Sequence, residues 1–134
     1  MSKNKSNKIK NFVDAHKKLS EAVKIYKTDP NNTIYQDALI QRFEFTFELS
    51  WKALKEFMIL NGLKDDLNFP KQILKEAFQL KIIKNENIWL EMLNARNLTS
   101  HIYDGNVASQ IANNICEKFW FELEELTKHF IYDL

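Results

Sequence analysis

The sequence has little of what turns, disulfide bonds and metal clusters are made from. Its 134 residues include only 2 glycines and 2 prolines, which leaves almost no material for the tight turns of β-hairpins. A single cysteine, Cys116, excludes a disulfide bond within the chain and a zinc site built from several cysteines. No apolar run approaches the roughly 18 residues of a membrane span, and no signal-peptide core follows Met1. Together these absences favour a helical protein of the cytoplasm.

The sequence also lacks a large excess of charge of either sign. The formal net charge is +1, so no global field attracts or repels nucleic acid. Residues 1–10 nevertheless carry four lysines and no acid, whereas residues 117–134 carry five acids and two lysines. The lysine-rich start is either a frayed, solvated terminus or an arm that contacts phosphate. We expect a flexible basic N-terminus over residues 1–7, and any nucleic-acid contact has to come from a local site.

Apolar residues at helical spacing are what the sequence has in quantity. Hydrophobic residues make up 45% of the chain, and no internal repeat or linker interrupts it, which predicts one domain over residues 1–134. Asp29-Pro30, Asn61-Gly62, Pro70 and Asp104 are suited to helix ends. Apolar residues recurring every three or four positions predict four main helices and a short third one, in an all-α, antiparallel up-and-down bundle. The predicted ranges are 8–27, 33–61, 70–80, 86–100 and 105–131.

The second predicted helix has an apolar sector that covers about half of its circumference. This is wider than one neighbouring helix requires, so the helix is central in the bundle, serves a dimer interface, or does both. Phe78 in the following short helix is also expected to face inward. The apolar sector comprises Leu39, Ile40, Phe43, Phe47, Leu49, Trp51, Ala53, Leu54, Phe57, Met58 and Leu60, and the narrow polar remainder comprises Gln41, Glu44, Glu48, Lys52 and Lys55.

One segment, residues 95–104, concentrates side chains capable of chemistry. It reads Ala-Arg-Asn-Leu-Thr-Ser-His-Ile-Tyr-Asp and follows a strongly apolar helix. On the helical wheel Arg96 falls between Trp89 and Met92, inside the stripe that packs against the bundle. A guanidinium there has to be paired or has to face a cleft.

Arginine is rare in this chain, which draws further attention to Arg96. Of the 19 basic residues only Arg42 and Arg96 are arginine. A planar guanidinium at position 96 is suited to clamping a phosphate or carboxylate, but it could equally anchor a helix end through carbonyls or an acid. Arg42 lies at the edge of the wide face of the second helix; it either lines the same cleft or is there by chance.

His101 is five residues after Arg96, about 140° away on an unbroken helix. The two side chains therefore share a site only if the helix ends between them or a second subunit completes the site. Asn97 lies on the same face as His101, and Ser100 and Asp104 are near enough in sequence to orient the imidazole. His101 is either a structural, hydrogen-bonded residue at a helix end or a catalytic one.

The order of residues in this segment resembles a known signature. Arg96, four intervening residues, His101, one residue and Tyr103 resemble the Arg-x4-His-x-Tyr motif of the HEPN superfamily, small helical bundles encoded beside minimal nucleotidyltransferases. Three further blocks resemble the branch called nucleotidyltransferase substrate-binding proteins, and the resemblance covers about residues 8 to 130. These blocks are residues 43–52, 70–78 and 89–97.

The resemblance implies two different functions. In toxin members the motif forms a metal-independent ribonuclease site in a cleft between two protomers, and the partner nucleotidyltransferase silences the toxin by adenylylating the tyrosine. Carried over, Arg96 would stabilise the phosphorane, His101 would act as general acid or base, and Asn97 would orient one of them. Tyr103 would be the modified residue. The branch name implies instead a non-catalytic subunit that presents a substrate or nucleotide to the transferase.

Other kinds of site have weaker support in the sequence. His16 and His129 lie on separate predicted helices without a ligand pattern, so we interpret them as surface or packing residues. No glycine-rich phosphate loop, metal-type spacing of His and Cys, or nucleophile elbow occurs. We therefore expect no metal and no cofactor. The resemblance implies a homodimer that partners a nucleotidyltransferase and contacts RNA or a nucleotide.

Overall fold

The computed structural model describes residues 7–63, 66–100 and 104–132. All regular structure in these ranges is helical, which confirms the predicted all-α class. Each predicted helix is present with ends within two residues of the expected ones, and the last predicted helix contains a π-helical turn, η2. The elements are α1 (Asn7–Thr28), α2 (Thr33–Leu60), α3 (Pro70–Gln79), α4 (Glu86–Thr99), α5 (Gly105–Asn114), η2 (Ile115–Phe119) and α6 (Trp120–Tyr132).

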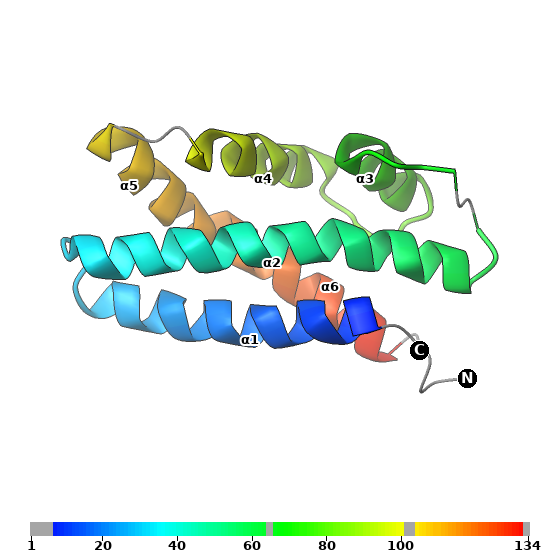
Figure 1. Ribbon diagram of the computed structural model, residues 1–134, viewed down its shortest axis with the longest axis horizontal. Coiled ribbons are helices and arrows are strands. Elements are labelled where there is room, and N and C mark those ends of the chain that lie inside the picture. The colour runs from blue at the N-terminus through cyan, green and yellow to red at the C-terminus, as the bar shows by residue number, and fades with distance from the viewer. Residues whose placement is uncertain (1–6, 64–65, 101–103, 133–134) are drawn as a thin grey trace.

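The helices form a bundle around α2. Figure 1 shows α1 lying along one side of α2 and α3 and α4 along the other, while α5 and α6 cross behind them. Helix α2 packs against α1, α3, α4 and α5, so it occupies the central position that its wide apolar sector predicted. None of the helices described is long and apolar enough to cross a membrane.

Helix ends follow the local sequence. Asn32 caps α2, because its side-chain oxygen accepts the Tyr35 N–H at 3.0 Å. At the other end Gly62 adopts a φ of 72°, and the Leu63 N–H reaches the Met58 carbonyl at 2.8 Å, which is a Schellman ending. Pro70 occupies the first turn of α3, where its missing N–H costs nothing.

Aromatic side chains fill the core where α2 meets its neighbours. Phe43 and Phe47 are fully buried; Phe43 stacks on Phe119 at a centroid distance of 5.4 Å, and Phe47 lies 6.3 Å from Trp89 of α4. The first contact fixes η2 against α2, and the second fixes α4 against α2. The apolar stripe predicted for residues 105–131 is buried throughout, and it comprises Ala108, Ile111, Ala112, Ile115, Phe119, Leu123, Leu126 and Phe130.

The prediction of a core position is wrong for two residues. Leu60 and Phe78, both expected to face inward, are 45% and 37% exposed. Leu60 is the last residue of α2 and Phe78 lies in the last turn of α3, so both wrong predictions fall at the end of a helix, whereas the middle of each apolar stripe is buried.

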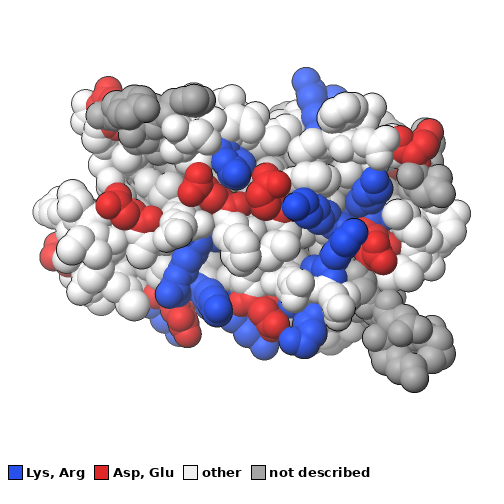
Figure 2. Space-filling view, in the orientation of Figure 1, with Lys and Arg blue, Asp and Glu red and all other residues white. Residues whose placement is uncertain are grey.

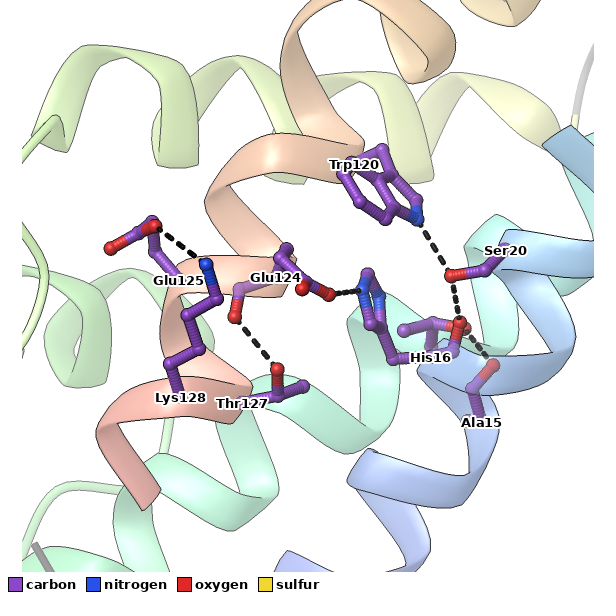
Figure 3. Close-up of polar contacts among 9 residues, drawn as sticks. Ala15, His16, Ser20, Trp120, Glu124, Glu125, Thr127 and Lys128 are labelled. Atoms are coloured by element: carbon purple, nitrogen blue, oxygen red, sulfur yellow. Dashed lines mark hydrogen bonds and ion pairs between the residues drawn. The ribbon is translucent and has the colours of Figure 1, made fainter. Parts of the chain in front are cut away.

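His16 was expected to be either a surface residue or a packing residue, and the structure shows that it is a packing residue. His16 is only 4% exposed, its ring stacks on Trp120 at 5.3 Å, and its Nε2 lies 2.8 Å from the Glu124 carboxylate of α6 (Figure 3). The Trp120 indole N–H donates to the Ser20 hydroxyl, which donates to the His16 carbonyl. The buried Nδ1 has no hydrogen-bond partner among the described residues.

This environment makes stability depend on pH. Burial lowers the pKa of His16, and the hydrogen bond and charge of Glu124 only partly offset that effect. Protonation would also place a proton on Nδ1, where no acceptor lies among the described residues. A lowered folded-state pKa means that the contribution of His16 is complete above about pH 6.5 and is lost as the pH falls below it.

We therefore expect the free energy of unfolding to fall between about pH 7.5 and pH 5.5, by at most about 1.4 kcal/mol per pH unit from this group. Urea unfolding of the wild type and of His16→Gln over this range measures the difference, since every carboxylate except that of Glu124 keeps the same neighbours in both proteins. Parallel curves for the two proteins would contradict the assignment.

Candidate functional site

Helix α4 places Arg96 between the core and the surface. Trp89, Met92 and Ala95 of the same helix are buried, and the Arg96 side chain is 27% exposed. The prediction that Arg96 lies within the apolar stripe is confirmed. Its guanidinium reaches the central helix α2 and does not extend into free solvent.

Two carboxylates of α2 hold this guanidinium. Arg96 Nη1 lies 3.7 Å from a Glu44 oxygen, and Arg96 Nε lies 3.6 Å from a Glu48 oxygen. Both distances allow ion pairing but exceed hydrogen-bond length, and the buried Nε has no hydrogen-bond partner in the described part of the chain. The Thr99 hydroxyl also donates to Glu44 and lies 2.7 Å from the Arg96 carbonyl. Arg96 is thus oriented by charge while retaining unused donor capacity.

These groups line a shallow cleft of about 520 Å³ on the exposed side of α2. Arg42 belongs to the same cleft as Arg96, which confirms the first of the two roles considered for it. Its Nη1 donates to the Lys18 carbonyl at 2.7 Å and lies 3.2 Å from Glu21. The cleft is lined by Ala15, Lys18, Gln41, Arg42, Glu44, Phe45, Glu48 and Arg96.

The charges in the cleft are divided between its two sides. Figure 2 shows this face: acidic and basic side chains alternate along the upper side of α2, a second row of basic side chains with acidic ones among them lies lower toward α1, and uncharged surface lies between the two rows. On the α1 side two cations, Lys18 and Arg42, outnumber the one acid, Glu21, that pairs with Arg42. On the α4 side the two carboxylates Glu44 and Glu48 outnumber Arg96. An anion is therefore attracted most strongly on the α1 side.

The remaining predicted site residues are only partly tested. Asn97 and Ser100 are exposed, at the end of α4. Asp104 caps α5, as predicted: one carboxylate oxygen accepts the Asn106 N–H at 2.8 Å. His101 and Tyr103 lie outside the described residues. Arg96 and His101 can share a site only if the helix ends between them or a second subunit completes the site. The first condition is met, because α4 ends at Thr99.

Comparison with known proteins identifies the family. The sequence profile described as "Nucleotidyltransferase substrate binding protein like" matches residues 7–130. The chain belongs to this family. It is similar to a protein of Haemophilus influenzae named "Probable ribonuclease HepT", with 35% identity over 116 residues, covering 78% of this chain and 79% of the relative. Its fold is similar to a crystal structure of a Thermus thermophilus protein, with a TM-score of 0.69, 26% identity, and coverage of 82% and 96% of the two chains.

In this member of the nucleotidyltransferase substrate-binding-like family, sequence reasoning missed the partners of Arg96. Glu44 and Glu48 were placed on the polar strip of the second helix, without a link to Arg96. Their spacing of four residues, which aligns two carboxylates on one face, is the signal that could have suggested a cation between them. Within the described residues, no group of three or more His, Cys, Asp or Glu side chains could hold a metal ion.

Proposed function

We propose that this protein is the helical partner of a minimal nucleotidyltransferase in a toxin–antitoxin-like module and carries a metal-independent ribonuclease site at Arg96 and His101. The observation that carries the proposal is the half-buried Arg96 guanidinium, which faces a cleft, is held by two carboxylates, and keeps a buried Nε without a hydrogen-bond partner among the described residues. Membership of the family and the similarity to a protein named as a probable ribonuclease support it.

The proposed reaction uses the ribose 2′-hydroxyl as nucleophile. His101 takes the proton from that hydroxyl or gives one to the leaving 5′-oxygen, and the Arg96 guanidinium stabilises the negative charge on the phosphorane between them. The 2′-oxygen–phosphorus bond forms and the phosphorus–5′-oxygen bond breaks, giving a 2′,3′-cyclic phosphate and a 5′-hydroxyl. Asn97 orients one of the two groups, and Ser100 and Asp104 support the imidazole.

The proposed site needs His101 beside Arg96, either from the same chain, since α4 ends between the two residues, or from a second protomer. We infer a homodimer in which Arg96 and His101 of two protomers face one phosphate, because Arg96 lines a cleft on the surface of the single chain that a second protomer can cover. The carboxylates Glu44 and Glu48 keep the guanidinium extended toward the cleft until the phosphate competes for it.

Cleavage of single-stranded RNA by the purified protein in the presence of EDTA tests the ribonuclease. The wild type should cleave RNA and leave DNA of the same sequence intact, because DNA has no 2′-hydroxyl. His101→Ala should abolish cleavage while the helical content stays unchanged. Intact RNA at high concentrations of a folded wild-type protein would refute the ribonuclease.

The family description supports a second candidate, a non-catalytic subunit that presents a nucleotide or another substrate to the transferase. The acidic neighbours of Arg96 favour it, because they lower the affinity of the cleft for a multiply charged backbone. Co-expression with a minimal nucleotidyltransferase, followed by mass measurement of Tyr103, separates the two. An adenylylated Tyr103 supports the toxin module, whereas a transferase that requires this unmodified chain for activity supports the presenting subunit.

A further inference from the structure

An exposed aromatic side chain lies in the middle of the charged cleft. Phe45 is 63% exposed, although the adjacent aromatics of the same helix, Phe43 and Phe47, are fully buried. It lines the cleft together with Arg42 and Arg96, and its ring has no aromatic neighbour among the described residues. Nothing in the packing of the described residues accounts for a phenylalanine at this position.

The helical wheel of α2 places Phe45 between the two charged sides of the cleft. Arg42 is about 60° to one side of Phe45, and Glu48 is about 60° to the other. Arg42 bonds to α1, and Glu48 pairs with Arg96 of α4, so Phe45 projects from the ridge of α2 between those helices. The exposed Phe45 ring therefore lies between Arg42 on the α1 side of the cleft and the Glu48–Arg96 ion pair on the α4 side.

Arg42 has donors available at this position. Only its Nη1 is used, by the Lys18 carbonyl and Glu21, so Nε and Nη2 have no hydrogen-bond partner within the described ranges. The neighbouring Lys18 ammonium forms no ion pair within 4.0 Å there. Both cations can therefore contact a phosphate without breaking the bond that anchors Arg42 to α1.

We propose that Phe45 is a stacking platform for a nucleobase of single-stranded RNA, with Arg42 and Lys18 contacting the adjoining backbone phosphate. An aromatic face beside cationic side chains such as Arg42 and Lys18 is the arrangement by which proteins bind single strands, since every base has a π-face to stack. The platform rests on the proposed function: it places the neighbouring nucleotide so that the next phosphate meets Arg96. The ligand class is an unpaired nucleotide, because a base within a duplex has no free face.

Equilibrium binding to an oligonucleotide that cannot be cleaved tests the platform separately from catalysis. The probe is a fluorescein-labelled 2′-O-methyl RNA of about eight nucleotides, followed by fluorescence anisotropy at fixed low salt. Phe45→Ala should raise Kd by about 5- to 150-fold, as expected for one stacked base, and Phe45→Trp should restore tight binding. Phe69→Ala is the matched control, because Phe69 is 66% exposed at the start of α3 and lies outside the cleft.

An abasic version of the same probe shows whether the base is what Phe45 contacts. The wild type should lose affinity for the abasic probe, and Phe45→Ala should bind both probes equally. A wild-type Kd for Phe45→Ala, or a change from dimer to monomer in that variant, would overturn the platform and make Phe45 an interface residue. If the wild type binds the probe through Phe45 but never cleaves RNA, the proposed ribonuclease is refuted and the stacking platform stands. If Arg96→Ala loses cleavage while Phe45→Ala binds the probe as the wild type does, the stacking platform is refuted and the ribonuclease stands.

Discussion

Arg96→Ala is expected to lower the rate of metal-independent RNA cleavage by about 100- to 1000-fold, the usual cost of removing one donor that stabilises transition-state charge. Arg96→Lys should fail nearly as badly, because an ammonium keeps the charge but loses the planar set of donors. Single-turnover cleavage of a labelled RNA, with protein in excess, measures the chemical step directly. The loss should appear in the cleavage rate at saturating protein.

The fold should survive this substitution. The Arg96 side chain and its two acidic partners are each about a third exposed or less, and surface ion pairs of this kind contribute at most about 1 kcal/mol. Lys118→Ala is the matched control: Lys118 pairs with Glu91 of the same helix α4 at 2.8 Å, outside the cleft. Equal cleavage by wild type and Arg96→Ala, or equal losses in Arg96→Ala and Lys118→Ala, would mean that Arg96 is only a structural anchor.

Phe47→Ala is expected to lower the free energy of unfolding by about 3–5 kcal/mol, the cost of removing a buried phenylalanine and leaving a cavity. Phe47 is fully buried where α2 meets α4. Its ring centroid lies 6.2 Å from that of Phe43 and 6.3 Å from that of Trp89. Because this contact also holds Arg96 near Glu44 and Glu48, the variant should lose order at the cleft as it loses stability. Urea unfolding followed by far-UV circular dichroism measures the change.

Phe45→Ala on the same helix provides the comparison. Phe45 is two residues from Phe47, about 200° around the helix, and largely exposed, so its truncation should change stability by no more than about 0.5 kcal/mol. Comparable losses of stability in the two variants would show that the helix is rotated relative to the arrangement described.

Helix boundaries could be predicted closely because local chemistry sets them. Asn61-Gly62 ends α2 through a left-handed glycine, and Asp104 begins α5 through a side-chain cap, and each needs only neighbouring residues. The partial burial of Arg96 could be predicted from the helical spacing of the apolar residues Trp89 and Met92 on either side of it. A partner or a cleft was required there by the cost of burying a guanidinium, and the structure has both.

Contacts between helices could not be predicted in the same way. The pairing of Glu44 and Glu48 with Arg96 depends on how α4 is aligned along α2, which the aromatic packing around Phe47 and Trp89 determines. The exposure of Phe45, by contrast, could have been predicted, because the helical wheel places it between Arg42 and Glu48 and outside the apolar sector of α2. The π-helical turn at Ile115–Phe119 had no signal, since the apolar stripe continues through it.

The ends of the RNA fragments test the central claim most directly. A single-stranded RNA incubated with the wild-type protein in EDTA should yield fragments with 2′,3′-cyclic phosphate and 5′-hydroxyl ends, and a 2′-deoxy substitution at a cleaved position should block cleavage there. Mass spectrometry of the fragments identifies both ends in one experiment. Intact RNA with a correctly folded protein, or fragments carrying 5′-phosphate ends, would contradict a site in which Arg96 and His101 promote attack by the 2′-hydroxyl.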